Sequence, residues 1–188
     1  MLQIHIAGSK RAGKTTLGTH LAEALNQMQM NPVLVDVDAL RASVFGPLTQ
    51  VPDSDASLDV HLETIRFIFR WVIPSVITSG GTPIVVAGHS RAPQYDGALE
   101  ISRRFNTSLK FLLLETPPLS EASLRGASTE KDRSDMRNFS DRRIKESFLQ
   151  SAFRINALYK EERGPHLLRL AQAAPKVVFR RALDFILA

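Results

Sequence analysis

The sequence predicts an α/β fold in which one parallel β-sheet lies between layers of helices, and the whole chain (1–188) forms a single domain. Two observations support this prediction. Short apolar segments alternate with longer helical patterns, and the segments lack a regular alternation of polar and apolar residues, which is typical of parallel strands buried on both faces. The length of 188 residues also suits one full-sized hydrophobic core.

The first half of the chain contains three predicted strands and two predicted helices. Pro32 separates the first helix from the second strand, and a pair of glycines ends the second helix. Phe67, Phe69 and Trp71 on the second helix are expected to pack in the core. The predicted strands are 3–7, 32–37 and 82–88, and the predicted helices are 14–30 and 58–78.

The second half adds a helix, a strand, a long helix and a C-terminal strand–helix pair. The apolar run LKFLLLE supplies the fourth strand, and VVF (177–179) is the expected fifth strand. A polar, charged segment without apolar periodicity separates the fourth strand from the long helix. The predicted ranges are 96–105 for the first helix, 109–115 for the fourth strand and 136–162 for the long helix.

The composition excludes several classes of protein. The chain has no cysteine, so disulfides and thiolate metal sites are excluded and a cytoplasmic location is expected. It has neither a long apolar run nor a basic leader, so we expect no membrane span and no signal peptide. Residues 1–100 hold 7 Lys and Arg against 9 Asp and Glu, whereas residues 101–188 hold 17 against 10. This basic second half fits either a solvated helix surface or a phosphate-rich partner.

A phosphate-binding loop follows the first strand. Gly8, Gly13, Lys14 and Thr15 satisfy the pattern G-x-x-x-x-G-K-[ST], and the loop lies between a predicted strand and a predicted helix, as its mechanism requires. The backbone N–H groups would surround the phosphates of ATP, Lys14 would reach the β- and γ-phosphates, and the Thr15 hydroxyl would bind Mg²⁺. The expected nucleotide-binding residues are Gly8, Ser9, Ala12, Gly13, Lys14, Thr15 and Thr16.

A phosphate-binding loop specifies a ligand but not a reaction. The guanine-binding [NT]-K-x-D pattern of GTPases is missing, and no strand ends in the consecutive acids of oligomeric ATPases. These absences favour a kinase.

Two aspartates and an arginine follow the second strand. Asp36 and Asp38 lie at its carboxyl end, the edge of a parallel sheet where ligands bind. A carboxylate there could take the proton of an acceptor hydroxyl or hold the metal through water. Arg41 would lie one turn further along the same helix face and could bind an anionic group of the acceptor. The alternative is that Asp38 only caps a helix starting at Ala39.

Together these segments resemble the small P-loop kinases related to adenylylsulfate kinase and polynucleotide 5′-hydroxyl kinase. The resemblance rests on GSKRAGKTT (8–16) and on Asp38 with Arg41 three residues later. It implies a five-stranded parallel sheet of order 2-3-1-4-5. It also implies that Asp38 is the general base or positions the acceptor, and that Arg41 contacts the acceptor's phosphate or sugar.

One departure from that group concerns the metal. Many P-loop proteins place an aspartate at the end of the third strand, whereas this chain has Gly88 and His89 there. Asp36 or Asp38 would then take over the contact with Mg²⁺, and we place the metal at Thr15 and Asp36. Arg91, at the same edge of the sheet, is a further candidate for the acceptor pocket.

The polar segment 123–137 corresponds to the lid of such kinases, whose arginines close over the ATP phosphates. A transferring phosphoryl group needs its charge stabilised away from water, because ATP is otherwise hydrolysed. Arg125 and Arg133 are the catalytic candidates in this segment, alongside Lys14 and Asp38. An exposed charged loop is the alternative, since the segment also contains acidic residues.

The sequence therefore predicts an ATP- and Mg²⁺-dependent kinase that phosphorylates a hydroxyl of a small acceptor, nucleotide-like or otherwise anionic. One alternative is an ATP-binding regulatory protein that hydrolyses ATP slowly without an acceptor. The other is a nucleic-acid 5′-hydroxyl kinase or nucleic-acid binder, which is less favoured. The sequence does not specify the oligomeric state.

Overall fold

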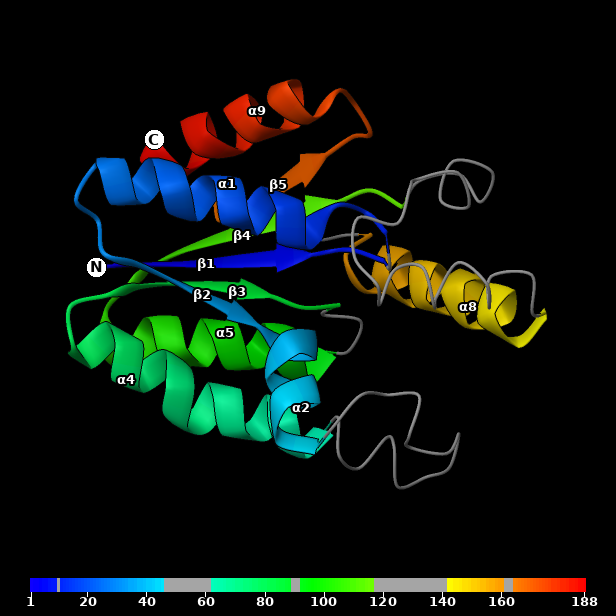
Figure 1. Cartoon of the computed structure of the whole chain (residues 1–188), viewed down its shortest axis with the longest axis horizontal. Helices are drawn as coiled ribbons and strands as arrows, with labels where there is room; N and C mark the ends of the chain where they lie inside the picture. Colours follow the sequence, from blue (N-terminus) through cyan, green and yellow to red (C-terminus); the bar gives the residue numbers. More distant parts are fainter. Residues whose placement is uncertain (10, 46–61, 89–91, 117–141, 161–163) are drawn as a thin grey trace.

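The computed structural model describes residues 1–9, 11–45, 62–88, 92–116, 142–160 and 164–188. Five parallel strands form one sheet of order β2-β3-β1-β4-β5, which confirms the expected topology. The strands are β1 (Leu2–Ala7), β2 (Pro32–Asp36), β3 (Thr82–Val86), β4 (Ser108–Leu114) and β5 (Leu167–Leu170). All carboxyl ends lie at one edge, and the two chain termini lie at the opposite edge (Figure 1).

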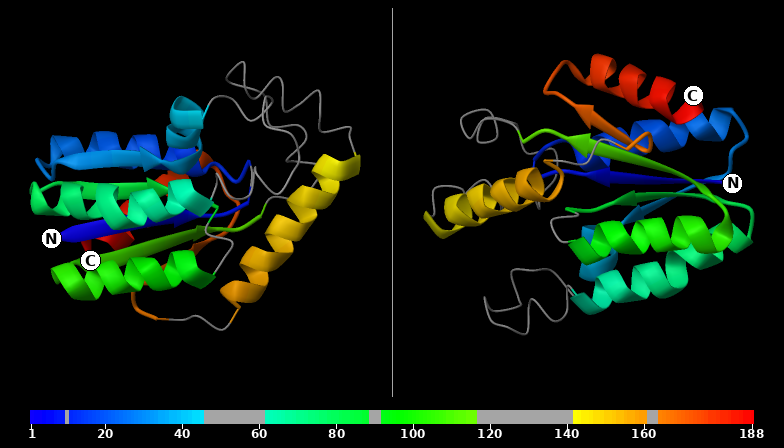
Figure 2. Two further views of the ribbon diagram at one scale, coloured as in Figure 1. Left: turned by 90° about the horizontal axis from the view of Figure 1, so that it is seen from below. Right: turned by 180° about the vertical axis from the view of Figure 1, so that it is seen from behind.

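Helices cover both faces of the sheet, and two more lie at its carboxyl edge (Figures 1 and 2). One face carries α1 (Lys14–Gln27) and α9 (Pro175–Leu187). The other carries α5 (Ala92–Phe105) and one continuous helical segment made of residues 62–67, the π-helical turn η2 (Ile68–Val72) and α4 (Ile73–Thr78). The helices α2 (Val37–Phe45) and α8 (Arg142–Leu158) lie at the carboxyl edge.

The two faces of β1 carry different side chains because successive residues of a strand point to opposite sides. Ile4 and Ile6 are fully buried against Leu21 and Leu25 of α1. Gln3 and His5 face the other layer and are also fully buried. A separate aromatic cluster joins the end of α8 to α5 and β4 through Tyr159, Tyr95 and Phe111.

The two buried polar residues of β1 are hydrogen-bonded within the protein. Gln3 Nε2 donates a hydrogen bond to the carbonyl of Ala98 in α5 at 3.0 Å, which leaves Gln3 Oε1 to accept from His5 Nε2 at 3.3 Å. The His5 ring lies 5.9 Å from the rings of both Phe69 and Phe111. Burial in this apolar setting lowers the pKa of His5 to about 3, because the charged imidazolium has lost its water.

Two sequence-based expectations need correction, the place of the fifth strand and the burial of two aromatic residues. Residues 177–179 belong to α9 rather than to a strand, because Pro175 occupies the first turn, a position that favours helix initiation. The fifth strand is the apolar run Leu167–Leu170 instead. Phe67 and Trp71 are about half exposed, whereas Ile68 between them is fully buried.

The helical boundaries otherwise agree with the sequence within a few residues, where the structure describes them. The helix expected over 96–105 begins at Ala92. In the long helix expected over 136–162, the described part is Arg142–Leu158. No helix in the described part of the chain has the length and apolar character that crossing a membrane requires.

Burial of His5 predicts a pH-dependent stability. Its pKa is about 3 in the folded protein and 6.5 in a short unstructured peptide, so the unfolded chain takes up a proton first as the pH falls. Below pH 6.5 this residue should lower the free energy of unfolding by about 1.4 kcal/mol per pH unit. Urea unfolding of wild type and His5→Leu between pH 7.5 and 5 measures the effect, because only wild type should show this slope. Parallel pH profiles for the two proteins would contradict it.

Candidate active site

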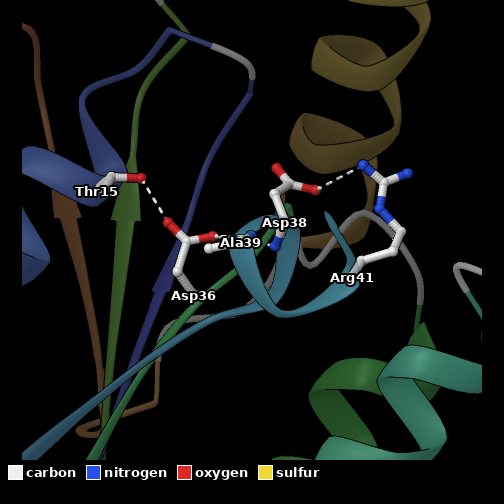
Figure 3. Close-up of polar contacts among 5 residues, drawn as sticks. All are labelled: Thr15, Asp36, Asp38, Ala39 and Arg41. Carbon is white, nitrogen blue, oxygen red and sulfur yellow. Dashed lines mark hydrogen bonds and ion pairs between the residues drawn. The ribbon is translucent and has the colours of Figure 1, made fainter. Parts of the chain in front are cut away.

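Three segments meet at the carboxyl edge of the sheet and bring the predicted residues together. They are the loop between β1 and α1, the junction of β2 with α2, and the end of β3. Figure 3 shows the central contacts, in which Asp36 lies between the hydroxyl of Thr15 and the first turn of α2.

The loop after β1 needs its glycines for two different reasons. Gly13 precedes α1 with φ +91°, in the left-handed region that side chains rarely adopt. A Cβ on Gly8 would lie 3.0 Å from the carbonyl oxygen of Leu114 and 3.2 Å from the Cβ of Ala12. Both glycines of the pattern have a positive φ, +152° at Gly8 and +91° at Gly13, and Gly8 is in addition in close contact with β4.

The amino end of α1 has no side-chain cap. Gly13 occupies the capping position, and no side chain makes a capping hydrogen bond there. The first turn of a helix leaves N–H groups without intrahelical partners, and the helix dipole makes this end partly positive. Lys14 adds a full positive charge, and its Nζ donates a hydrogen bond to the carbonyl of Ser9 at 2.7 Å. An anion is the ligand that fits this combination.

Asp36 joins the loop to α2. Its Oδ2 accepts a hydrogen bond from Thr15 Oγ1 at 2.9 Å, and its Oδ1 accepts from the backbone N–H groups of Asp38 at 3.0 Å and Ala39 at 3.1 Å (Figure 3). This is the geometry of a helix cap. The cap of α2 is thus Asp36, and the alternative in which Asp38 serves only as the cap is wrong.

Asp38 is consequently available for other contacts, and it forms one with Arg41. The Asp38 side chain is 57% exposed, whereas that of Arg41 is 7% exposed, and Asp38 Oδ1 lies 3.8 Å from Arg41 Nη2. Arg41 Nε is buried without a hydrogen-bond partner. A buried guanidinium with one distant carboxylate is poorly compensated, because removing a charge from water is costly. The site therefore has unused capacity to bind an anion beside an exposed carboxylate.

The end of β3 carries no acidic side chain within the described residues. Ala87 and Gly88 follow the strand, and Ala87 N–H donates to the carbonyl of Ile6. The described ranges also contain no group of three or more His, Cys, Asp and Glu residues arranged to hold a metal. Thr15 and Asp36 nonetheless present two oxygen atoms beside the anion-binding loop. This donor set fits Mg²⁺, which usually takes only one or two protein oxygens and completes its shell with phosphates and water.

Several predicted residues lie outside the described residues. They are Arg91, His89 and the segment 123–137 with Arg125 and Arg133. The described candidates all lie at one edge of the sheet: Gly8, Ser9, Ala12, Gly13, Lys14, Thr15, Thr16, Asp36, Asp38 and Arg41. Sequence reasoning missed the hydrogen bonds of Asp36 to α2. A cap at that position requires the helix to begin at Val37, which the sequence did not indicate because Val37 also continues the apolar strand.

Comparison with known proteins identifies the fold. Neither the protein-family models nor the curated proteins include a match to this sequence. Among solved structures, the APS kinase of Mycobacterium tuberculosis in complex with AMPPNP and APS has a TM-score of 0.65 at 15% identity, covering 100% of this chain and 98% of that one. The shikimate kinase of Acinetobacter baumannii with shikimate has a TM-score of 0.64 at 17% identity and coverages of 100% and 93%. A gluconokinase of Sinorhizobium meliloti 1021 has a TM-score of 0.60 at 18% identity and coverages of 99% and 91%.

These matches span whole chains, so the likeness extends well beyond the phosphate-binding loop. The chain has the fold of small P-loop kinases, in agreement with the resemblance carried by its motifs. The three solved proteins act on chemically different small molecules, so the shared fold leaves the acceptor open.

The contacts of Asp36 predict that the variants Asp36→Ala and Asp38→Ala differ in their free energy of unfolding, although the two residues are only two positions apart. Asp36→Ala should lower the free energy of unfolding by about 1–2 kcal/mol, because it removes a helix cap and the partner of Thr15. Asp38→Ala should change it by less than Asp36→Ala does, because the Asp38 carboxylate is 57% exposed and lies 3.8 Å from its one described partner, Arg41. Urea denaturation at pH 7 measures both variants. If Asp38→Ala lowered the free energy of unfolding more than Asp36→Ala, Asp36 would not be the cap of α2.

Proposed function

We propose that the protein is an ATP- and Mg²⁺-dependent kinase that transfers the γ-phosphate to a hydroxyl of a small anionic acceptor. One observation carries the proposal: a carboxylate cap fixes the exposed Asp38 and the buried Arg41 directly beside the anion-binding loop. A protein that only bound ATP would need the loop but not this pair. The folds of adenylylsulfate, shikimate and gluconate kinases support the reaction class.

The loop would hold the nucleotide. The N–H groups at the uncapped end of α1 would donate to phosphate oxygens, and Lys14 would move its ammonium from the carbonyl of Ser9 to the β- and γ-phosphates. Thr15 and Asp36 would hold the metal, directly or through water. Bound Mg²⁺ would neutralise charge on the phosphates during transfer.

Asp38 and Arg41 would receive the acceptor. The acceptor hydroxyl would attack the γ-phosphorus, its proton would pass to the Asp38 carboxylate, and the bond between the γ-phosphorus and the β–γ bridging oxygen would break to release ADP. Arg41 would bind an anionic group of the acceptor, either a carboxylate or the phosphate of a nucleotide-like molecule. Arg91, Arg125 and Arg133 remain proposed contributors from outside the described residues.

The test is ATP turnover with Mg²⁺ against a panel of acceptors: adenylylsulfate, shikimate, gluconate, nucleosides, nucleoside monophosphates and a 5′-hydroxyl oligonucleotide. At least one should stimulate turnover in wild type, and Asp38→Asn should reduce the stimulated rate at least 100-fold, as expected for a lost general base. Glu23→Gln, which removes an exposed acid of α1, should leave the rate unchanged. Slow turnover insensitive to all acceptors would indicate the regulatory alternative, and salt-sensitive oligonucleotide binding that survives Lys14→Ala would indicate the nucleic-acid binder.

The proposed metal contact predicts a selective effect of Asp36→Asn. The amide keeps an oxygen that can cap α2, so stability should fall little, but the charge that favours a cation beside Thr15 is lost. The Mg²⁺ concentration for half-maximal turnover should rise about tenfold, with a smaller change in the KM for the acceptor. Titration of Mg²⁺ at fixed ATP measures this. An unchanged Mg²⁺ requirement in a stably folded variant would remove Asp36 from the metal site.

A further inference from the structure

Gln94 is a buried polar residue that the proposed reaction does not yet use. It lies in the first turn of α5, is only 5% exposed, and its Oε1 has no hydrogen-bond partner. Burying an unpaired amide oxygen is costly to a fold. The chain satisfies its other buried glutamine of this layer completely, since Gln3 is paired with both Ala98 and His5. Thr107 Oγ1 at the far end of α5 is also buried without a partner, so the position of Gln94 matters as much as its unpaired oxygen.

The position of Gln94 places it beside the candidate active site. Ala98, one helical turn later, accepts the hydrogen bond from Gln3, and Gly97 lies against the ring of Phe69, so this side of α5 faces the sheet and η2. Helical side chains lean toward the amino end of their helix. The amino end of α5 lies at the carboxyl edge of the sheet, where the phosphate-binding loop and Asp38 also lie (Figure 1). From its position in the first turn of α5, we expect the Gln94 carboxamide to lie toward that edge.

Gly88 leaves open space at the same edge. Among the described residues, a Cβ placed on it would have no atom within 4 Å, and its φ is outside the left-handed region. Gly97 differs, because a Cβ there would lie 2.8 Å from Phe69 Cδ1, and Gly13 differs because its φ is +91°. Neither a neighbouring atom nor the backbone of the described chain therefore requires glycine at position 88. The open position leaves room for a ligand at this edge of the sheet.

We propose that Gln94 Oε1 accepts a hydrogen bond from a hydroxyl of the acceptor other than the one that is phosphorylated, and that Gly88 provides the space for that part of the acceptor. This inference rests on the proposed kinase function and narrows its substrate class. With Arg41 binding the negative charge and Asp38 the reacting hydroxyl, the acceptor is a small anionic compound with at least two hydroxyl groups. Gln94 would then help to select the acceptor and would take no part in the transfer of the phosphate.

The experiment compares Gln94→Leu and Gly88→Ala with Thr107→Val, using the panel acceptor that stimulates wild type most. Thr107 is a matched control, because it is also buried with an unpaired side-chain oxygen but lies at the opposite end of α5. Gln94→Leu should raise the KM for the acceptor roughly tenfold, as expected for one lost hydrogen bond, and leave the KM for ATP unchanged. Gly88→Ala should raise the acceptor KM without changing the melting temperature. Thr107→Val should change neither KM.

The folded protein and the acceptor provide two further readouts. The melting temperature of Gln94→Leu should be equal to or above that of wild type, because an unpaired amide is replaced by an apolar group. An acceptor analogue that lacks the non-reacting hydroxyl should have a higher KM than the parent acceptor with wild type, whereas the two KM values should be equal with Gln94→Leu. An acceptor KM within twofold of wild type, or a lowered melting temperature with both KM values raised, would overturn the assignment. If an acceptor stimulates wild-type turnover in an Asp38-dependent way but Gln94→Leu keeps the wild-type acceptor KM, only this inference fails. If no acceptor stimulates wild-type turnover, both the inference and the proposed function fail.

Discussion

The carboxylate of Asp36 connects the parts of the candidate site. One oxygen accepts from Thr15 on the phosphate-binding loop, and the other accepts from two N–H groups that open α2. Because a helix direction is set by its first turn, this cap also sets where Asp38 and Arg41 lie relative to the loop. The carboxylate belongs to an edge strand of the sheet, whose register with β3 is fixed by parallel pairing from Pro32 to Asp36. The placement of Asp38 and Arg41 relative to the phosphate-binding loop therefore depends on the single side chain of Asp36, which the sheet holds in place.

Buried polar groups without a partner occur at the candidate site and also elsewhere, as at Thr107 Oγ1 beyond the far end of α5. Within the sheet, Gln3 and His5 are fully buried and hydrogen-bonded to each other and to α5. At the carboxyl edge, α1 has no side-chain cap, and Arg41 Nε and Gln94 Oε1 are buried without partners. An unpaired buried group lowers the stability of a fold, and a ligand that pairs with it would recover part of this cost. Arg41 Nε and Gln94 Oε1 both lie at the edge that carries the phosphate-binding loop, which supports the proposed site there.

The missing acid at the end of β3 has a structural consequence. With Ala87 and Gly88 there, the carboxylate beside Thr15 comes from the second strand, as Asp36, two residues before the aspartate proposed to act on the acceptor. Gly88 carries no side chain, and we propose that part of the acceptor occupies the space beside it.

The sequence by itself determined the fold class, the sheet order implied by its resemblance, the phosphate-binding loop and the nearness of Asp38 to Arg41. The fold class, the loop and the Asp38–Arg41 pair depend on local spacing: apolar runs of strand length, glycines at fixed intervals, and residues three apart on a helix. The sheet order came only from the resemblance of the motifs to a known group of kinases. Only the tertiary structure decided that Asp36 rather than Asp38 caps α2, that VVF is helical, and that Trp71 is exposed while Gln94 is buried. These outcomes depend on which elements pack together, because burial and hydrogen-bond partners come from residues distant in the sequence, such as Gln3 and Ala98.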